Sequence, residues 1–199
     1  STGLLHEDYV GQEVHMAWST DGLHWSEPQV IVHTHPESKI VRNNAGLCAA
    51  GGKLYNYVCV ANDFRRDVVP PGMMGLVQQK IRLDAYSTAD LLHWEHHENL
   101  NDNIYLFEGP RPTLSGKYIC CGFDVINHDA MMLIWDDASR LAEPPRVVRV
   151  PSSPEGPLPE QGTWYQTGDG RIYMFHRDTS VSCRLGLNWS DDDGETWSK

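Results

Sequence analysis

The chain has 199 residues, a formal net charge of -11, 40% hydrophobic residues and 22% charged residues. This length allows one ordinary domain or two small ones, and the apolar fraction favours a folded chain over a disordered one. The acidic balance argues against nucleic acid as a partner, because phosphate binding needs clustered Lys and Arg. No apolar run approaches the ~20 residues of a membrane-spanning helix, so no membrane partner is expected.

The start of the chain, STGLLHEDYV, has neither an initiator methionine nor a signal-peptide pattern, so we expect a mature, trimmed or partial chain. The five cysteines are odd in number and lie mostly in apolar runs. This predicts buried free thiols, with a single disulfide as the alternative. Adjacent Cys120 and Cys121 are expected on opposite faces of one strand. The histidine clusters lack zinc-site spacing, so neither a metal nor a cofactor is expected.

An apolar run that ends in an aromatic residue recurs along the chain. The runs are EVHMAWS, IRLDAYS, MMLIWDD and RLGLNWS, with Trp18, Tyr86, Trp135 and Trp189 as their aromatic residues. These aromatics are 68, 49 and 54 positions apart. Regular spacing near 50 predicts a repeated unit of four short strands.

Glycine-containing tight turns precede the last three runs, in GGKLYNYVCV, SGKYICCGFD and DGRIYMFHRD. Glycine supplies a positive φ angle without steric cost, which is typical of hairpin turns. Each unit is therefore expected to contain a strand, a tight turn, a strand, a longer loop, a strand, a tryptophan-bearing turn and a last strand. This pattern predicts an all-β chain of four-stranded antiparallel units.

The tryptophan-bearing turns are clearest in SDDDGETWSK at the end of the chain. There we expect the Asp192 carboxylate to accept backbone N–H bonds, Gly194 to adopt a left-handed backbone, and Trp197 to fold back over the hairpin. We interpret the acids as a structural clasp rather than a catalytic pair, because the pattern recurs where an enzyme needs one site.

Ser190–Trp197 resembles the Asp-box of sialidases and of the wider bacterial-neuraminidase-repeat (BNR) family. Ser19–Trp25 is one residue shorter, Ser87–Trp94 keeps the aspartate but lacks the glycine, and Trp135–Pro144 is degenerate. The resemblance covers most of the chain and is sharpest from Gly168 onward. It implies a β-propeller of six blades, or seven in some carbohydrate-active relatives. Five-bladed glycosidases also contain such turns and are an alternative.

Three nearly complete units and one partial unit fill the chain, so we expect a single, partial β-propeller domain over residues 1–199. About three to four of six four-stranded antiparallel blades would be present. A closed ring of four blades is the alternative, and the end of the chain within a turn favours the partial propeller. The tryptophan turns and tight glycine turns are expected on one face. The longer loops are expected on the other face, and we expect the binding and catalytic residues there, because long loops on a rigid scaffold often carry them.

Sialidases hold the substrate carboxylate with an arginine triad, because planar guanidinium groups match a carboxylate. The resemblance makes Arg177 the best candidate and Arg42 and Arg111 further candidates, with an ordinary surface or structural role as the alternative for each. Trp164 or Tyr165 could stack on a sugar ring.

The resemblance also implies a glutamate that activates a tyrosine nucleophile, and that tyrosine would come from a later blade. Glu160 falls next to the expected position, which strict counting from the tight turn assigns to Gln161. Asp124 and His128 are candidate acid or base groups, because they lie on a loop of the functional face. The alternative for both is that they hold a turn.

The resemblance favours a sialidase-like exo-glycosidase that removes a terminal acidic sugar from a glycan or oligosaccharide. One alternative is a polysaccharide lyase or uronate-directed hydrolase with His128 as its base. Another is a BNR module that binds glycans without catalysis. Family resemblance leads us to expect secretion or a periplasmic location, whereas the oligomeric state is not predicted.

Overall fold

A computed structural model describes residues 12–35, 37–62, 80–151, 159–178 and 185–198. These residues form four antiparallel sheets, and the only helical segment described among them is the 3₁₀ turn η3 (Ala138–Arg140). The predicted all-β class is therefore confirmed. Within the described ranges, no helix combines the length and the apolar character needed to cross a lipid bilayer.

Each sheet follows the chain from strand to neighbouring strand. The smallest sheet pairs β1 (Val14–Met16) with β2 (Gln29–Val32). The next sheet has the order β3 (Val41–Ala50), β4 (Lys53–Ala61), β5 (Arg82–Thr88) and β6 (Glu95–Asp102). The third has the order β7 (Ile104–Leu106), β9 (Tyr118–Asp124), β10 (Ala130–Trp135) and β11 (Arg146–Arg149), with β8 (Arg111–Pro112) also on β9. The last has the order β12 (Pro159–Gln166), β13 (Ile172–Asp178) and β14 (Leu185–Ser190).

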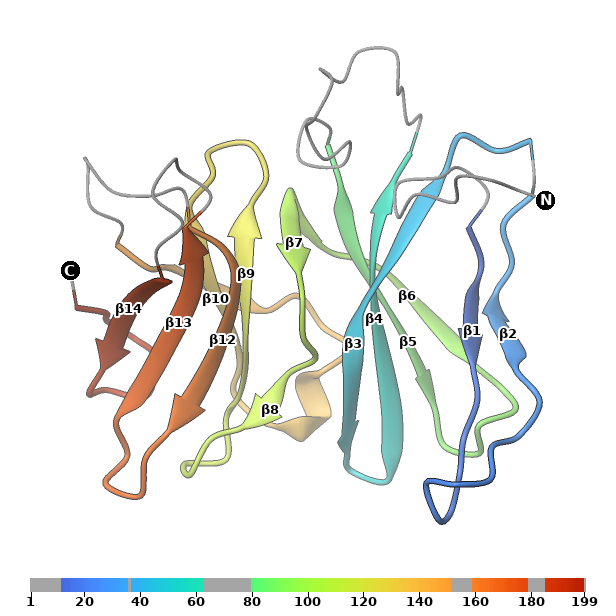
Figure 1. Cartoon of the computed structure of the whole chain (residues 1–199), viewed down its shortest axis with the longest axis horizontal. Helices are drawn as coiled ribbons and strands as arrows, with labels where there is room; N and C mark the ends of the chain where they lie inside the picture. Colours follow the sequence, from blue (N-terminus) through green and yellow to red (C-terminus); the bar gives the residue numbers. More distant parts are fainter. Residues whose placement is uncertain (1–11, 36, 63–79, 152–158, 179–184, 199) are drawn as a thin grey trace.

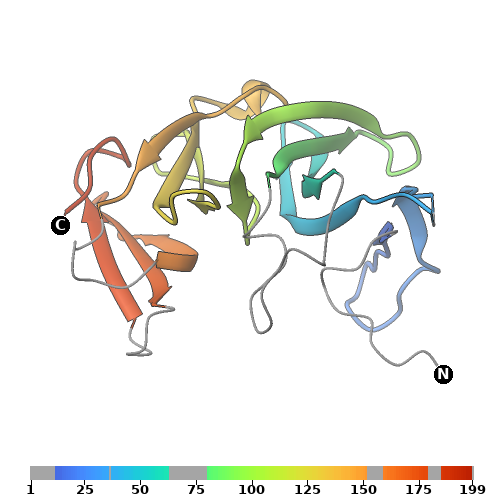
Figure 2. The same ribbon diagram turned by 90° about the horizontal axis from the view of Figure 1, so that it is seen from above.

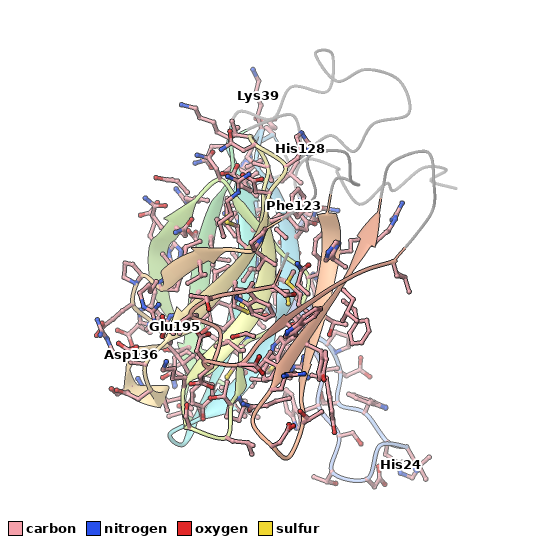
Figure 3. The ribbon with its side chains drawn as sticks, turned by 90° about the vertical axis from the view of Figure 1, so that its left-hand side faces the viewer. His24, Lys39, Phe123, His128, Asp136 and Glu195 are labelled. Atoms are coloured by element: carbon pink, nitrogen blue, oxygen red, sulfur yellow. The ribbon has the colours of Figure 1, made fainter. Side chains whose placement is uncertain are left out.

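The sheets succeed one another along an arc, with β3, β7, β8 and β12 on its concave side (Figures 1 and 2). We call these four the inner strands. The tight turns and the tryptophan-bearing turns lie at the lower end of the sheets in Figure 1, as the sequence predicts. Figure 3 shows His128, from the β9–β10 loop, and Lys39, before β3, at the end opposite His24.

Apolar side chains fill the spaces between successive sheets. The space between the β3–β6 and β7–β11 sheets contains Tyr57, Leu83, Phe123 and Trp135, each at most 2% exposed. Cys120 lies in this core and Cys121 in the next one, so the prediction that they face opposite sides of one strand is confirmed. The four described cysteines are buried and unbridged, whereas Cys183 lies outside the described residues.

The last sheet has one covered face and one uncovered face. Trp164, Ile172 and Met174 pack toward β9 and β10. On the other face, large apolar side chains stay exposed to solvent: Tyr165, Phe175, Leu185, Leu187 and Trp189. These exposed apolar residues alternate with buried residues along β12, β13 and β14. Apolar residues on both faces are typical of a sheet that packs against neighbours on both sides.

The final tryptophan-bearing turn forms the predicted clasp. Asp192 accepts hydrogen bonds from the Thr196 N–H (2.8 Å) and hydroxyl (2.5 Å), and Gly194 has φ +87°. The Trp197 indole donates to the Gly194 carbonyl oxygen at 3.0 Å and is buried. The acids therefore hold the turn. Glu195 ties it to the neighbouring sheet by accepting two hydrogen bonds from Arg146, at 2.5 and 2.7 Å.

The second tryptophan-bearing turn begins one residue later than its sequence match suggests. Thr88, rather than Ser87, takes the place that Ser19 has in the first turn, since its hydroxyl accepts from the Leu91 N–H at 2.9 Å. Each turn then has an aspartate that caps the backbone and lies within 2.8 Å of a histidine Nδ1 three residues on. The two turns are thus equal in length, S-T-D-G-L-H-W and T-A-D-L-L-H-W. Leu91 has φ +64°, where Gly22 has φ +74°.

We expect Leu91→Gly to stabilise the protein by about 0.5–1 kcal/mol. A non-glycine residue at positive φ costs about 1–2 kcal/mol, which exceeds the entropy that glycine adds to the unfolded chain. Urea unfolding measures the gain. Leu92→Gly in the same turn is the matched control, because Leu92 is not among the residues with positive φ, and it should give no gain. A loss of stability in Leu91→Gly would contradict this interpretation of the turn.

Candidate functional site

Arg111 and Trp164 form the best-defined polar cluster on the inner strands. The Arg111 guanidinium, on β8, stacks over the Trp164 ring of β12 at 4.4 Å from the ring centre. Its Nη2 atom donates to the Trp164 carbonyl oxygen at 2.6 Å and to Glu108 Oε2 at 3.1 Å. The side chain is nevertheless 45% exposed. Because ring, carbonyl and carboxylate fix its orientation, Arg111 presents a preorganised cation to solvent.

Glu108 lies between β7 and β8 and joins this cluster to two further strands. Its Oε2 atom accepts a hydrogen bond from the Thr163 hydroxyl at 3.0 Å, and its Oε1 atom accepts one from the Cys121 N–H at 3.4 Å. The side chain is only 19% exposed. Burial raises the pKa of Glu108, and the smaller opposing effects of Arg111, Thr163 and Cys121 do not cancel this increase.

Trp164 and Tyr165 are neighbours on β12 but face opposite ways. The Trp164 ring is 5% exposed, and its Nε1–H donates to the Ile119 carbonyl oxygen at 3.2 Å. It therefore supports Arg111 from inside the core. Tyr165 is 63% exposed and belongs to the uncovered apolar face of the last sheet. Of the two rings, only that of Tyr165 is accessible for stacking on a sugar.

Arg177 lies at the upper end of β13, where its Nη1 atom donates to Gln161 Oε1 at 3.0 Å. Gln161 has φ +49° and lies in a bulge of β12 between Glu160 and Gly162. The backbone of Glu160 pairs with Arg177, but the Glu160 side chain lies outside the described part of the structure. The amide at Gln161 thus holds the exposed Arg177, as the Glu108 carboxylate holds Arg111.

Arg42 lies near the upper end of β3, and its Nη1 atom donates to the Thr34 hydroxyl. Burial raises the pKa of Tyr86, and the nearby Arg42 opposes this increase, first through its charge and second through hydrogen bonding. The described hydrogen bonds of Arg42, Arg111 and Arg177 go to other residues, not to one another's partners. The three arginines come from three successive sheets: Arg42 and Arg177 lie near the upper ends of β3 and β13, whereas Arg111 lies on β8, toward the lower end of its sheet (Figure 1).

Asp124 and His128 lie close together in the β9–β10 loop. The Asp124 carboxylate accepts from the backbone N–H groups of Ile126 (2.7 Å) and Asn127 (3.0 Å), and His128 N–H donates to the Asp124 carbonyl oxygen. Burial acts to raise the pKa of Asp124, but these hydrogen bonds and the charge of His128 together lower it. These hydrogen bonds are typical of residues that hold a turn. A turn-holding role is the alternative to an acid or base role that the sequence analysis gives for Asp124 and His128.

A repeated glycine that lies outside the motifs described above explains how Glu108 reaches its position. Gly46, Gly109 and Gly162 lie on or beside the inner strands, each upstream of a tight turn. A Cβ atom on Gly109 would lie 2.1 Å from the Leu47 carbonyl oxygen of β3. The inner strands can therefore approach closely. Glu108 directly precedes Gly109, and Gln161 directly precedes Gly162.

The histidine cluster on β6, away from the inner strands, has the geometry of a structural site. Ser87 Oγ and Glu95 Oε2 both face the same His97 nitrogen, Nε2, at 2.9 and 3.8 Å. A proton relay needs the two partners on opposite ring nitrogens, so this is not a Ser–His–acid triad. Among the described residues, no group of three His, Cys, Asp or Glu side chains could hold a metal ion.

Comparison with known proteins identifies the fold but not a family. No protein-family model matches the sequence, and no curated protein matches it either. Three solved structures of the NanB sialidase of Streptococcus pneumoniae are similar to the chain. They are a complex with 2-[(3-chlorobenzyl)ammonio]ethanesulfonate (TM-score 0.68, 13% identity), one with Optactamide (0.66, 13%) and a point mutant (0.65, 12%).

Each match covers 96% of this chain and 48% of the NanB chain, so the chain spans about half the length of these structures. Identity of 12–13% is a likeness of fold alone. Over nearly its whole length, the chain has a sialidase-like, all-β fold.

Proposed function

We propose that this chain forms part of a carbohydrate-active β-propeller whose inner strands bind a glycan with a terminal acidic sugar, and that the whole protein is a sialidase-like exo-glycosidase. The observation that carries the proposal is the Arg111 guanidinium, which Trp164 and Glu108 hold in a fixed, half-exposed position on an inner strand. A preorganised guanidinium is suited to a carboxylate, since little entropy is lost when the ligand binds.

The uncovered face of the last sheet supports a proposal about architecture. A row of exposed Tyr, Phe, Leu and Trp side chains is unusual on a solvated sheet face. We propose that residues 1–199 are one partial domain and that a further blade of the same propeller covers this face. The similar sialidase structures are about twice as long as the chain, which agrees with additional blades.

Arg111 and Arg177 are proposed to contact the sugar carboxylate. Tyr165 belongs to the face that the further blade would cover, so it is a weaker candidate for stacking on the sugar ring. Arg42 and the acid or base candidates Glu160, Asp124 and His128 have fewer supporting contacts. For Asp124, a lowered pKa argues against donating a proton near neutral pH.

The test is turnover of a fluorogenic sialoside by the whole protein, in which a later blade would supply the tyrosine nucleophile. We expect Arg111→Ala and Arg177→Ala each to reduce kcat/KM at least about tenfold, because a charge-assisted hydrogen bond contributes about 1.5–3 kcal/mol. Arg140→Ala is the matched control, since Arg140 lies on η3, on the convex side away from the inner strands (Figure 2), and pairs with Glu143. Equal activity in all three variants would refute the proposal.

Two other outcomes would indicate the alternative functions. Sugar binding without turnover would indicate a BNR binding module, and new ultraviolet absorbance from an unsaturated uronate would indicate a lyase.

A further inference from the structure

Glu108 lies where three sheets meet. The adjoining Gly109 touches the backbone of β3 at Leu47, while the Glu108 carboxylate accepts hydrogen bonds from Cys121 of β9 and Thr163 of β12. It also pairs with Arg111 of β8. A carboxyl group fixed from several strands cannot move away from its arginine when its charge changes. Its protonation state therefore acts directly on Arg111.

Arg111 has hydrogen-bond donors left for a ligand. Its hydrogen bonds to the described residues all leave from Nη2, toward Glu108, the Thr163 hydroxyl and the Trp164 carbonyl. Within the described part of the chain, Nη1 and Nε have no hydrogen-bond partner. An anionic ligand at these donors would lie beside Glu108 and would feel its charge.

We propose that Glu108 is a positioning residue that makes binding of an acidic sugar at Arg111 depend on pH, with tighter binding when Glu108 is protonated. The ligand class in this inference rests on the proposed function. Ionised Glu108 neutralises Arg111 and repels the sugar carboxylate. Protonated Glu108 still bonds to Thr163 through its oxygens but leaves the full guanidinium charge for the ligand.

The surroundings of Glu108 contain few competing titratable groups. Arg111 faces it from β8, and the thiols of Cys120 and Cys121 face it from β9. Burial raises the pKa of both thiols well above the ordinary value of 9.0, so they stay neutral in the acidic range. Thr163 of β12 carries no charge. Burial also raises the pKa of Glu108 above its ordinary value of 4.5, so at a given acidic pH a larger share of Glu108 is protonated than of an ordinary glutamate.

The experiment titrates N-acetylneuraminate into the 199-residue protein between about pH 4.5 and 7.5, with calorimetry as the readout. We expect the wild-type Kd to be about three- to tenfold lower at the acidic end, the effect of removing a like charge a few ångströms from the ligand. Glu108→Gln is nearly isosteric and should bind with the acidic-limit Kd at every pH. Glu143→Gln is the matched control, because Glu143 also pairs with an arginine three positions away, and should keep the wild-type dependence.

A second variant shifts the transition without removing the carboxyl group. Thr163→Val deletes a hydroxyl that stabilises ionised Glu108, so the pKa of Glu108 should rise and the change in Kd should move to higher pH. Without ligand, the ¹³Cδ resonance of Glu108, assigned by its loss in Glu108→Gln, should titrate above pH 4.5.

The outcomes separate two failures. A Glu108→Gln variant that binds the sugar with the wild-type pH dependence, or a ¹³Cδ titration midpoint at or below 4.5, would overturn the role of Glu108 alone. Absence of sugar binding by the wild type at every pH, with a raised Glu108 titration, would overturn the proposed function and the ligand class with it.

Discussion

Gly109→Ala is expected to destabilise the fold by at least about 3 kcal/mol, the upper part of the range for overpacked sites. The new Cβ atom would lie 2.1 Å from the Leu47 carbonyl oxygen and 2.6 Å from its carbonyl carbon. Both atoms belong to the backbone of β3, so relief requires two sheets to separate. Urea unfolding followed by tryptophan fluorescence measures the loss, and in a chain of this size each kcal/mol lowers Tm by about 2–4 °C.

Gly168→Ala is the control for this experiment. Gly168 lies in the β12–β13 turn, where an added Cβ atom has no neighbour within 4 Å and φ is not in the left-handed range. Its stability should change by less than about 0.5 kcal/mol, as for ordinary surface substitutions. Equal stability of the two variants would mean that the inner strands do not approach each other as described.

Trp164→Ala should lower stability by about 3–5 kcal/mol, the usual cost of removing a buried large aromatic side chain. The change empties a position between β9 and β12 and leaves the Ile119 carbonyl without its indole donor. It also removes the ring beneath Arg111, so any remaining folded protein should bind an acidic sugar more weakly. Denaturant unfolding and sugar titration measure the two effects separately.

The neighbouring Tyr165→Ala is the matched control, since Tyr165 lies on the same strand and is exposed. It should change the free energy of unfolding by less than about 0.5 kcal/mol. A larger loss for Tyr165→Ala than for Trp164→Ala would reverse the assignment of the two faces of β12.

The strands and turns could be predicted because their signals are local. Apolar runs with an aromatic end and glycine turns such as Asp169–Gly170 are read within ten residues of sequence, and the structure has strands on both sides of each. The register of the second tryptophan-bearing turn was missed because Ser87 and Thr88 are both hydroxyl residues before Asp90. The equal Asp–His–Trp spacing of the two turns was the available signal, and the hydrogen bond from the Leu91 N–H to the Thr88 hydroxyl decides between them.

The site was less predictable because its contacts join distant segments. Glu108 gains its role from Cys121 and Thr163, which lie 13 and 55 positions away in sequence. No short motif contains such a set. Similarly, the exposed Tyr165 and buried Trp164 look alike as aromatic residues until the packing of β12 on β9 is known. The glycine that precedes each tight turn was the available signal, because it repeats with the sheets.

The central claim is that a guanidinium group on the inner strands recognises the carboxylate of an acidic sugar. The most direct measurement compares the affinity of the protein for N-acetylneuraminate and for its methyl ester, which differ in that charge. We predict that the ester binds at least about tenfold more weakly, as expected for loss of a charge-assisted contact, and that Arg111→Ala abolishes the difference. Equal affinity for acid and ester in the wild type would contradict the account.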